Sequence, residues 1–317
     1  MSQHHIPLLA TMVVFALLYI IAAAQFPAFR RPAIFGNFFS DNAFLGVAAV
    51  GMTFVILSGG IDLSVGAIVG MTSILVAVLI QNRHFSPLLA VAVALVIGTT
   101  LGAGMGAVIR YFKLPPFLVT LAGMFLARGS GFLISVESVP IKDASYARLS
   151  EWSLSLGPVD VPATTFIFVA VLLLGIALAH GTKFGRNVYA LGGDDDAANL
   201  MGLPVGPTRL RIYAFSGFCS ALAGVVYTIY SASGNASAAN GLELDAIASV
   251  VIGGTLLTGG VGYVAGTLMG VLIFGIIQTY ITFLNLSSWW TKIAVGVLLL
   301  FFVLIQKVLA RPAARTS

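Results

Sequence analysis

Asp62 is the carboxylate that stands out as a candidate for chemistry, because it lies in a long apolar stretch between two hydroxyls, Ser58 and Ser64. A double glycine, Gly59-Gly60, precedes it directly. If this stretch lies in a membrane, an ionisable group there is a functional candidate by default, and the glycines can unwind a helix to line a polar path. The alternative is a helix N-cap, in which Asp62 or Ser64 accepts backbone N–H bonds. A cap at a gating hinge would satisfy both interpretations, and the sequence leaves both open.

A second double glycine, Gly259-Gly260, repeats this pattern at a constant spacing. The stretch LSGGI at 57–61 resembles LTGGV at 257–261, with an offset of 200 residues (257 − 57). Duplicated helical units are common in transporters, where the substrate path follows the interface between the repeats. We therefore predict an internal repeat, against the alternative of chance similarity between glycine-rich segments. The residues predicted to line or gate the path are Ser58, Gly59, Gly60, Asp62, Ser64, Gly259 and Gly260.

Three polar residues lie on later apolar segments. Gln278 is a neutral hydrogen-bonding group of the kind that binds sugars, so we add it to the predicted path, although a helix–helix hydrogen bond is its plainer role. Glu243 and Asp245 open a short segment, where the helix dipole favours negative charge, and helix capping is the favoured interpretation for both. Few acidic residues lie deep in the apolar segments, which argues against a proton relay of carboxylates.

Motifs for catalysis, metal binding or nucleotide binding are not found. The chain has one cysteine, Cys219, four histidines and no HExxH motif, so no disulfide, cysteine metal site or zinc hydrolase is indicated. No GxxxxGK[ST] occurs, so ATP cannot bind through a P-loop. Residues 102–107 fit a dinucleotide fingerprint, but that motif needs a preceding strand. Since Gly98, Gly102 and Gly106 share one helix face, close helix packing is predicted instead. We predict no enzyme activity and no cofactor.

The polar segment 181–209 predicts a short, capped helix. Three aspartates at 194–196 follow two glycines and precede about two helical turns, which end at Gly202-Leu203-Pro204. Such a helix on the membrane face can dock into a cleft of a partner and transmit its motion, so a separate ATPase is the favoured energy source. The residues predicted to couple to it are Gly192, Asp194, Asp195, Asp196, Ala197, Ala198, Asn199, Leu200, Met201 and Gly202. A second polar segment, 136–162, is either a contact surface or a solvated connector.

The composition places these residues in a membrane protein. Hydrophobic residues make up 59% of the 317 residues and charged residues 9%, and the mean hydropathy is +1.03. Soluble domains carry roughly 25% charged residues, so a soluble enzyme is excluded, and disorder is excluded by the hydrophobicity. About 20 apolar residues cross a membrane as a helix. On that measure the sequence predicts an all-α, polytopic transmembrane helical bundle of about ten helices, forming a single transmembrane domain over 1–317.

The apolar segments are 7–25, 42–57, 64–80, 87–109, 117–135, 163–180, 210–230, 244–258, 261–284 and 289–307. The second, third and eighth are short or glycine-broken, so the sequence also allows about eight or nine full crossings. The N-terminus lacks a basic region and an evident cleavage site, so a retained helix is predicted rather than a signal peptide.

Basic residues predict the topology. With the N-terminus inside, nine Lys and Arg residues face inward and five outward, which favours cytoplasmic N- and C-termini by the positive-inside rule. The inward set is Arg110, Lys113, Lys183, Arg186, Arg209, Arg211, Lys307, Arg311 and Arg315. The outward set is Arg30, Arg31, Arg83, Lys142 and Arg148. Arg30 and Arg31 oppose this inward bias of basic residues. Since no clustered basic face occurs, nucleic-acid binding is not predicted.

Four motifs together resemble the ribose/galactose-type permeases of ABC sugar transporters. They are ILSGGIDLSVGAIVGM (56–71), FGRNVYALGG…AANLMGLPV (184–205), ELDAIASVVIGGTLLTGGVGYVAGTLMG (243–270) and LSSWWTKIAVGVLLL (286–300). The similarity extends over nearly the whole chain. Within the family, SDNAFLG (40–46) and LSSWWTKIA are most similar to the galactofuranose permeases of enteric bacteria.

This resemblance implies a permease of the bacterial inner membrane that imports a monosaccharide, in particular galactofuranose. It implies an ABC ATP-binding subunit, a second homologous permease subunit that forms a heterodimer with this one, and a periplasmic sugar-binding protein. By that resemblance, 194–202 is the helix that contacts the ATPase, although the three aspartates depart from the family's Asn and small polar residues. The alternatives are an ion-gradient-driven secondary sugar carrier and, less favoured, an intramembrane enzyme.

Overall fold

A computed structural model describes residues 6–309 of the chain, and the side chains of residues 9–307. Arg311 and Arg315, which entered the topology prediction, lie outside the described residues. In chain order the helices are α1 (Ile6–Gln25), the 3-10 helix η2 (Pro27–Arg30), α2 (Ala33–Asp41), α3 (Ala43–Leu57), α4 (Val65–Gln81), α5 (Pro87–Phe112), α6 (Pro116–Ile134), α7 (Ala144–Glu151), α8 (Ala163–Gly181), α9 (Lys183–Gly193), α10 (Asp195–Leu200), α11 (Val205–Ser231), α12 (Leu242–Ile252), α13 (Val264–Phe283) and α14 (Trp289–Leu309).

Four short strands form two small antiparallel sheets. Strand β1 (Val139–Pro140) pairs with β4 (Ser233–Gly234), and β2 (Ser153–Leu156) pairs with β3 (Val159–Pro162). The predicted all-α, polytopic bundle is confirmed, because helices form every long element of the described chain. Each of the predicted apolar segments corresponds to one of these helices, although the segment 244–258 is helical only as far as Ile252.

The number of full membrane crossings is smaller than the predicted number of helices. Within residues 6–309, six helices are long and apolar enough to cross a membrane, and a seventh is reached if α2 and α3, bent by 58°, count as one span. The ten predicted segments all form helices, but three of them fall outside this count of full crossings: α4 has 17 residues, α12 has 11, and α1 is counted over Leu9–Gln25 only. The sequence marked the segments of α4 and α12 as short or broken, but not that of α1.

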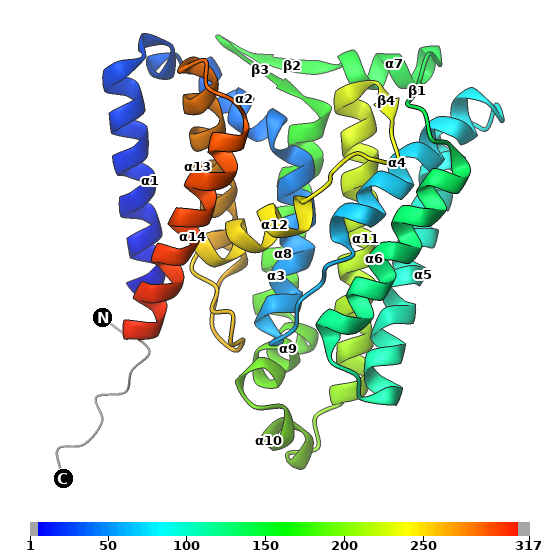
Figure 1. The fold of residues 1–317 in the computed structure, drawn as a ribbon, viewed down its shortest axis with the longest axis vertical. Helices are drawn as coiled ribbons and strands as arrows, with labels where there is room; N and C mark the ends of the chain where they lie inside the picture. Colours follow the sequence, from blue (N-terminus) through cyan, green and yellow to red (C-terminus); the bar gives the residue numbers. More distant parts are fainter. Residues whose placement is uncertain (1–5, 310–317) are drawn as a thin grey trace.

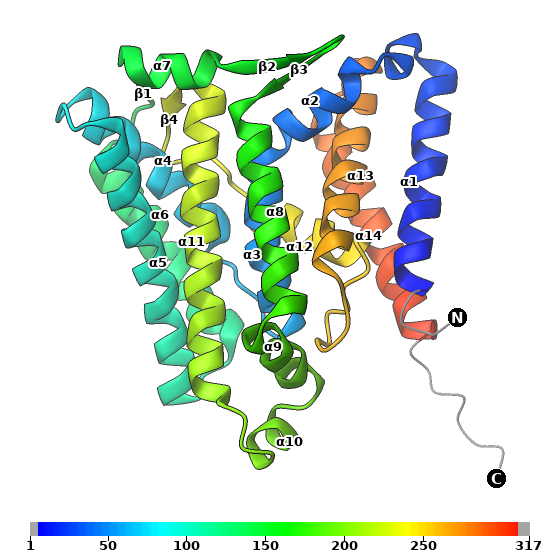
Figure 2. The ribbon, with the colours of Figure 1, turned by 180° about the vertical axis from the view of Figure 1, so that it is seen from behind.

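The long helices lie side by side, roughly along the long axis of the molecule (Figure 1). Helices α1, α13 and α14 form one flank, α4, α5, α6 and α11 form the other, and α3, α8 and α12 lie between them (Figure 1, Figure 2). Helices α9 and α10 project at one end, which we call the α10 end, and α1 begins and α14 ends on that side. Helix α7 and the β2–β3 hairpin cover the opposite end, the α7 end.

Glycines bring α5 and α11 into backbone contact, as the spacing of Gly98, Gly102 and Gly106 predicts. A Cβ at Gly102 would lie less than 3.0 Å from the Tyr213 carbonyl oxygen, and one at Gly106 would lie 3.0 Å from the Leu210 Cα. Close approach of helices through small residues is a common way of packing in membranes. The glycine stripe is therefore a packing device, and α5 is held firmly against the helix that follows α10.

The segment 136–162 is structured rather than a loose connector. Asp143 caps α7 by accepting from the amides of Ser145 and Tyr146, both at 3.0 Å. The Ser145 hydroxyl donates to the same oxygen, and these donors hold the pKa of Asp143 below its usual value. Tyr146 is buried, and its hydroxyl lies 2.6 Å from that of Thr228 on α11. This contact fixes α7 on the end of the bundle.

Candidate functional site

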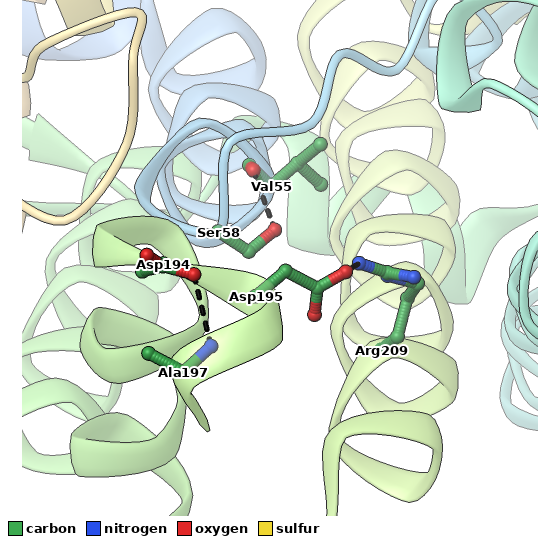
Figure 3. Close-up of polar contacts among 6 residues, drawn as sticks. All are labelled: Val55, Ser58, Asp194, Asp195, Ala197 and Arg209. Carbon is green, nitrogen blue, oxygen red and sulfur yellow. Dashed lines mark hydrogen bonds and ion pairs between the residues drawn. The ribbon is translucent and has the colours of Figure 1, made fainter. Parts of the chain in front are cut away.

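The first break in the helical structure separates α3 from α4 and has the form that the double glycine predicts. Ser58 ends α3, and its hydroxyl donates to the Val55 carbonyl at 2.7 Å (Figure 3). Gly59 has φ +77°, a conformation that residues with a side chain rarely adopt. A Cβ at Gly60 would lie 2.5 Å from the Tyr213 hydroxyl oxygen, so a side chain does not fit there either. Both glycines are required by the backbone path.

Asp62 lies inside this break and is completely buried. Its Oδ1 accepts from the Ser64 amide at 2.9 Å and from the Ser64 hydroxyl at 2.6 Å. Its Oδ2 accepts from the Ser216 hydroxyl on α11 at 2.7 Å. The carboxylate accepts a backbone N–H bond, as the capping interpretation predicts, but from Ser64, the N-cap residue itself, and no side chain caps the first turn of α4. Asp62 also ties the start of α4 to α11. Burial keeps Asp62 from facing an open path in this conformation, so a role in gating stays a prediction.

The second break separates α12 from α13 and touches the first. Gly259 and Gly260 have φ +85° and +75°. The Gly260 amide donates to the Leu57 carbonyl at 2.9 Å, and a Cβ at Gly259 would lie 2.7 Å from the Gly59 amide nitrogen. The two segments predicted to be repeats are thus packed backbone to backbone.

The end of α9 completes this contact. A Cβ at Gly192 would lie less than 3.0 Å from the Leu57 carbonyl oxygen and 2.5 Å from the Gly260 amide nitrogen. The Tyr189 hydroxyl donates to the Gly262 carbonyl at 2.8 Å, which adds a second link between α9 and the second break. We call residues 57–60, 192–193 and 259–260 the break junction. Three backbones therefore meet there with no intervening side chain.

Helix α10 follows α9 directly and confirms the short capped helix predicted over 194–202. The Asp194 carboxylate accepts from the Ala197 amide at 2.9 Å, and Asp195 forms an ion pair with Arg209 at 2.7 Å (Figure 3). Gly202 ends the helix with φ +76°. Ala198 faces inward and is buried, whereas Leu200 is 88% exposed and Met201 is 69% exposed. Two large apolar side chains therefore project from the tip of the molecule without a partner in the described chain.

A cavity of about 720 Å³ opens beside the break junction, and we call it the Gly192 cavity. Basic residues from α5 and α11 face the aspartates of α10 across it. It brings together many of the residues predicted for gating and coupling, namely Ser58, Gly59, Gly60, Gly192, Asp194, Asp195, Asp196 and Asn199. The predicted residues that do not line it are Asp62, Ser64, Gly259, Gly260, Ala197, Ala198, Leu200, Met201, Gly202 and Gln278. The cavity lies at the α10 end, between the projecting helices and the membrane-spanning part.

Gln278 lies in a different place. It lines a second cavity of about 510 Å³ between α2, α3, α12, α13 and α14, which we call the Gln278 cavity. Asp245 and Lys292 line it too, with Lys292 Nζ 2.7 and 2.6 Å from the two carboxylate oxygens. The structure therefore separates Gln278 from the glycine breaks with which the sequence groups it.

The prediction that Glu243 and Asp245 cap a helix is wrong, because neither side chain accepts a capping hydrogen bond. Both lie in the first turn of α12, where the dipole favours them, but the N-cap is Gly241 and no side chain caps this helix. Asp245 pairs with Lys292 instead. Glu243 is within electrostatic reach of Arg128 on α6, and its buried Oε2 accepts no hydrogen bond in the described part of the chain.

Arg128 is a structural group that the sequence reasoning missed. Its Nη1 donates to the carbonyls of Ala236 and Ala238 at 2.6 and 2.8 Å, which ties α6 to the segment that leads into α12. The signal was present, because a lone arginine in the middle of the apolar segment 117–135 is expensive unless it has partners. Metal binding has no support within residues 6–309, where no group of three or more His, Cys, Asp or Glu side chains could hold an ion.

Comparison with known proteins identifies the family. Residues 34–303 match the family model described as the branched-chain amino acid transport system / permease component. The chain is 51% identical over 310 residues to the inner membrane ABC transporter permease protein YjfF of Escherichia coli, covering 97% of this chain and 93% of that protein. It is 40% identical to the ribose import permease protein RbsC of Bacillus subtilis, over 92% and 90% of the two chains.

It is also 38% identical to the fructose import permease protein FruG of Bifidobacterium longum, over 97% of this chain and 92% of that protein. No solved structure matches the chain. Matches of this length cover the breaks, α9, α10 and both cavities together. The chain therefore belongs to the family of transport-system permease components.

Proposed function

We propose that this chain forms the transmembrane path of an ABC importer for a monosaccharide. The observation that carries the proposal is the break junction, where the end of α9 is packed against both helix breaks and α10 projects beyond it. Force applied to α10 reaches both breaks through backbone contacts alone. Since the sequence has no P-loop, either an ion gradient or a separate ATPase must supply this force, and the projecting α10 favours the ATPase.

The proposed partner at the α10 end is an ABC ATP-binding subunit. Leu200 and Met201 are exposed apolar side chains on a helix whose other face is anchored by Ala198 and by the Asp195–Arg209 ion pair. Such side chains suit a hydrophobic cleft of a docked protein. The residues predicted to couple, from Gly192 to Gly202, divide between this exposed tip and the Gly192 cavity. We propose that the exposed tip of α10 binds the ATP-binding subunit, and that the glycines transmit its movement to the helix breaks.

Two further partners complete the proposed importer. A second, homologous permease subunit would form a heterodimer with this chain, and a periplasmic sugar-binding protein would deliver substrate at the α7 end. Support for these partners comes from the family resemblance and from the names of the relatives, one an ABC transporter permease protein and two of them import permease proteins. The folded outer segment, fixed by Tyr146, offers a firm docking surface for the binding protein.

The proposed orientation places the α10 end in the cytoplasm of a bacterial inner membrane. The start of α1, the end of α14 and helices α9 and α10 lie at the same end of the bundle (Figure 1). Most of the basic residues counted as inward belong to that end, and the positive-inside rule assigns such an end to the cytoplasm. The N- and C-termini are then both cytoplasmic.

The proposed substrate is a neutral monosaccharide, with galactofuranose as the favoured sugar. The family model is named for branched-chain amino acids, but the relatives RbsC and FruG are named for ribose and fructose import. The motifs most similar to galactofuranose permeases, 40–46 and 286–294, contribute Asp41 and Lys292 to the Gln278 cavity. None of these relatives supports the alternative of an ion-gradient-driven carrier.

Purification tests the proposal directly. We expect an ABC ATP-binding subunit to co-purify with the intact chain, and we expect a Leu200→Ser, Met201→Ser double variant to lose it while inserting normally into membranes. The matched control is Leu244→Ser, which removes another exposed leucine (61% exposed) far from α10. Equal recovery of the ATPase with both variants would mean that α10 is not its docking site.

A further inference from the structure

The Gln278 cavity has the size of a small-molecule site and lies apart from the break junction. Its volume of about 510 Å³ falls within the roughly 300–1,000 Å³ that small-molecule sites enclose. Its walls come from five helices, with Asp41 on α2, Phe44 on α3, Leu242 on α12, Phe274 on α13 and Thr291 on α14. A site built from several helices of a bundle is held in shape by their packing, unlike a groove on one helix.

An ion pair occupies one wall of the cavity. Lys292 Nζ contacts both Asp245 oxygens, and the Asp245 side chain is only 12% exposed, against 46% for Lys292. Removing two charges from water is costly unless the remaining donors and acceptors also find partners. Each carboxylate oxygen can accept another hydrogen bond, and the ammonium has a third N–H. The pair therefore presents fixed donors and acceptors to whatever enters the cavity.

Gln278 presents a free amide beside this pair. It is the first exposed residue after seven consecutive buried residues of α13, Val271–Ile277. Its side chain makes no hydrogen bond within the part of the chain that the structure describes, although it lines the cavity. An amide can both donate and accept, as a sugar hydroxyl does. An uncommitted amide at this position is therefore suited to a ligand with hydroxyl groups.

The charge and the apolar walls narrow the class of ligand. The three charged side chains that line the cavity, Asp41, Asp245 and Lys292, sum to −1, which disfavours an anionic ligand such as a sugar phosphate or sugar acid. Phe44 and Phe274 offer apolar surface for the C–H groups of a sugar ring, and Phe44 is held at 5.7 Å from Tyr227 in an edge contact. Hydroxyl-binding groups beside aromatic rings, without net positive charge, suit a neutral polyol.

We infer that the Gln278 cavity binds the neutral monosaccharide in transit, with Gln278 and the Asp245–Lys292 pair contacting its hydroxyls. The inference rests on the proposed function. Helix α12 joins this cavity to the break junction, because Leu242 and Asp245 line the cavity and the helix ends at the second break. Displacement of the junction therefore shifts Asp245 relative to Lys292 and changes the donors and acceptors that hold the sugar.

The test uses the complete transporter in vesicles, with D-ribose, D-fructose and D-galactose as probes and saturating sugar-loaded binding protein. Uptake and ATP hydrolysis are measured together. We expect Gln278→Leu to lower sugar uptake per ATP hydrolysed by about tenfold, the effect of losing one well-placed hydrogen bond to the sugar. The recovery of the intact complex is measured beside uptake and ATP hydrolysis, because a general loss of structure would lower it.

Thr279→Val is the matched control, because Thr279 is the next residue on the same helix and does not line the cavity. Gln278→Glu keeps the side-chain length and its acceptors and is expected to lose less uptake than Gln278→Leu. Wild-type uptake per ATP in both Gln278 variants would overturn the inference while leaving the proposed function intact. If the wild-type complex hydrolyses ATP but moves none of the sugars, the proposed function itself fails.

Discussion

The break junction and the Gln278 cavity differ in the groups that form them: backbone in the first and side chains in the second. At the junction, backbone meets backbone: Gly192 and Gly259 leave no room for a methyl group, and Gly59 is required by its φ of +77°. In the cavity, side chains form the walls, and Lys292 of the charged pair is 46% exposed. Close-packed backbone cannot deform continuously, so it transmits displacement. A cavity lined by side chains can adapt to a ligand. In the proposed function, coupling at the junction therefore depends on the missing side chains of the glycines. Recognition of the sugar depends on the side chains that line the cavity.

The largest effect is expected from adding side chain to the junction. Gly192→Val places a branched side chain where a Cβ alone would overlap the Leu57 carbonyl and the Gly260 amide. Overpacking usually costs about 1–3 kcal/mol, and a clash with two backbones is expected to exceed about 3 kcal/mol. Thermal denaturation in detergent and sugar-stimulated ATPase activity measure the loss.

Gly193→Ala is its control on the neighbouring residue. A Cβ there meets nothing within 4 Å. It lies at the end of α9, so the change is expected to be neutral or stabilising by up to about 1 kcal/mol. If the two variants behaved alike, close backbone contact would not explain the junction.

The second largest effect is expected at Asp62. Asp62→Ala leaves the Ser64 amide and the Ser216 hydroxyl buried without their acceptor, a loss of about 3 kcal/mol. Asp62→Asn keeps an acceptor for Ser64 and is expected to fold nearly as well. Transport by the Asn variant then separates the two interpretations that the sequence left open. Reduced uptake with normal stability indicates a role for the charge in gating, and full uptake leaves Asp62 a structural group.

Arg128 holds the segment that leads from β4 into α12, the helix that lies between the Gln278 cavity and the second break. Arg128→Met removes its two hydrogen bonds to the carbonyls of Ala236 and Ala238, with an expected cost of about 2 kcal/mol. Proteolysis within 235–241 is expected to become faster than in the wild type. Unchanged protection of that segment would mean that α4 and β4 hold it without Arg128.

The smallest effect is expected at the surface of α10. Asp195→Asn removes the ion pair with Arg209, whose side chains are 47% and 25% exposed. Exposed pairs contribute about 0.2–1 kcal/mol, so stability is expected to change little. A drop in melting temperature as large as that of Asp62→Ala would show that α10 is held more tightly than its contacts indicate.

Local features of the fold were predictable from the sequence, whereas long-range contacts were not. Apolar length located the helices, and the aspartates and Gly202 located α10, because both signals act between residues near in the chain. The similarity between 57–61 and 257–261 indicated two similar helix breaks. It did not indicate that the breaks touch each other and α9, because those contacts join segments far apart in the chain. Asp245 was misread because its partner, Lys292, lies 47 residues away. The path role of Gln278 stays a prediction, and its separation from the glycine breaks became visible only in the structure.

The central claim is that a separate ATPase drives this permease through α10 and the break junction. Sugar accumulation in vesicles that contain the complete complex measures it most directly, with and without ATP and with an uncoupler. The account predicts accumulation that requires ATP and the ATPase subunit, survives the uncoupler and disappears in Gly192→Val but not in Gly193→Ala. Accumulation by this chain without any ATPase, or its collapse on adding the uncoupler, would contradict the account.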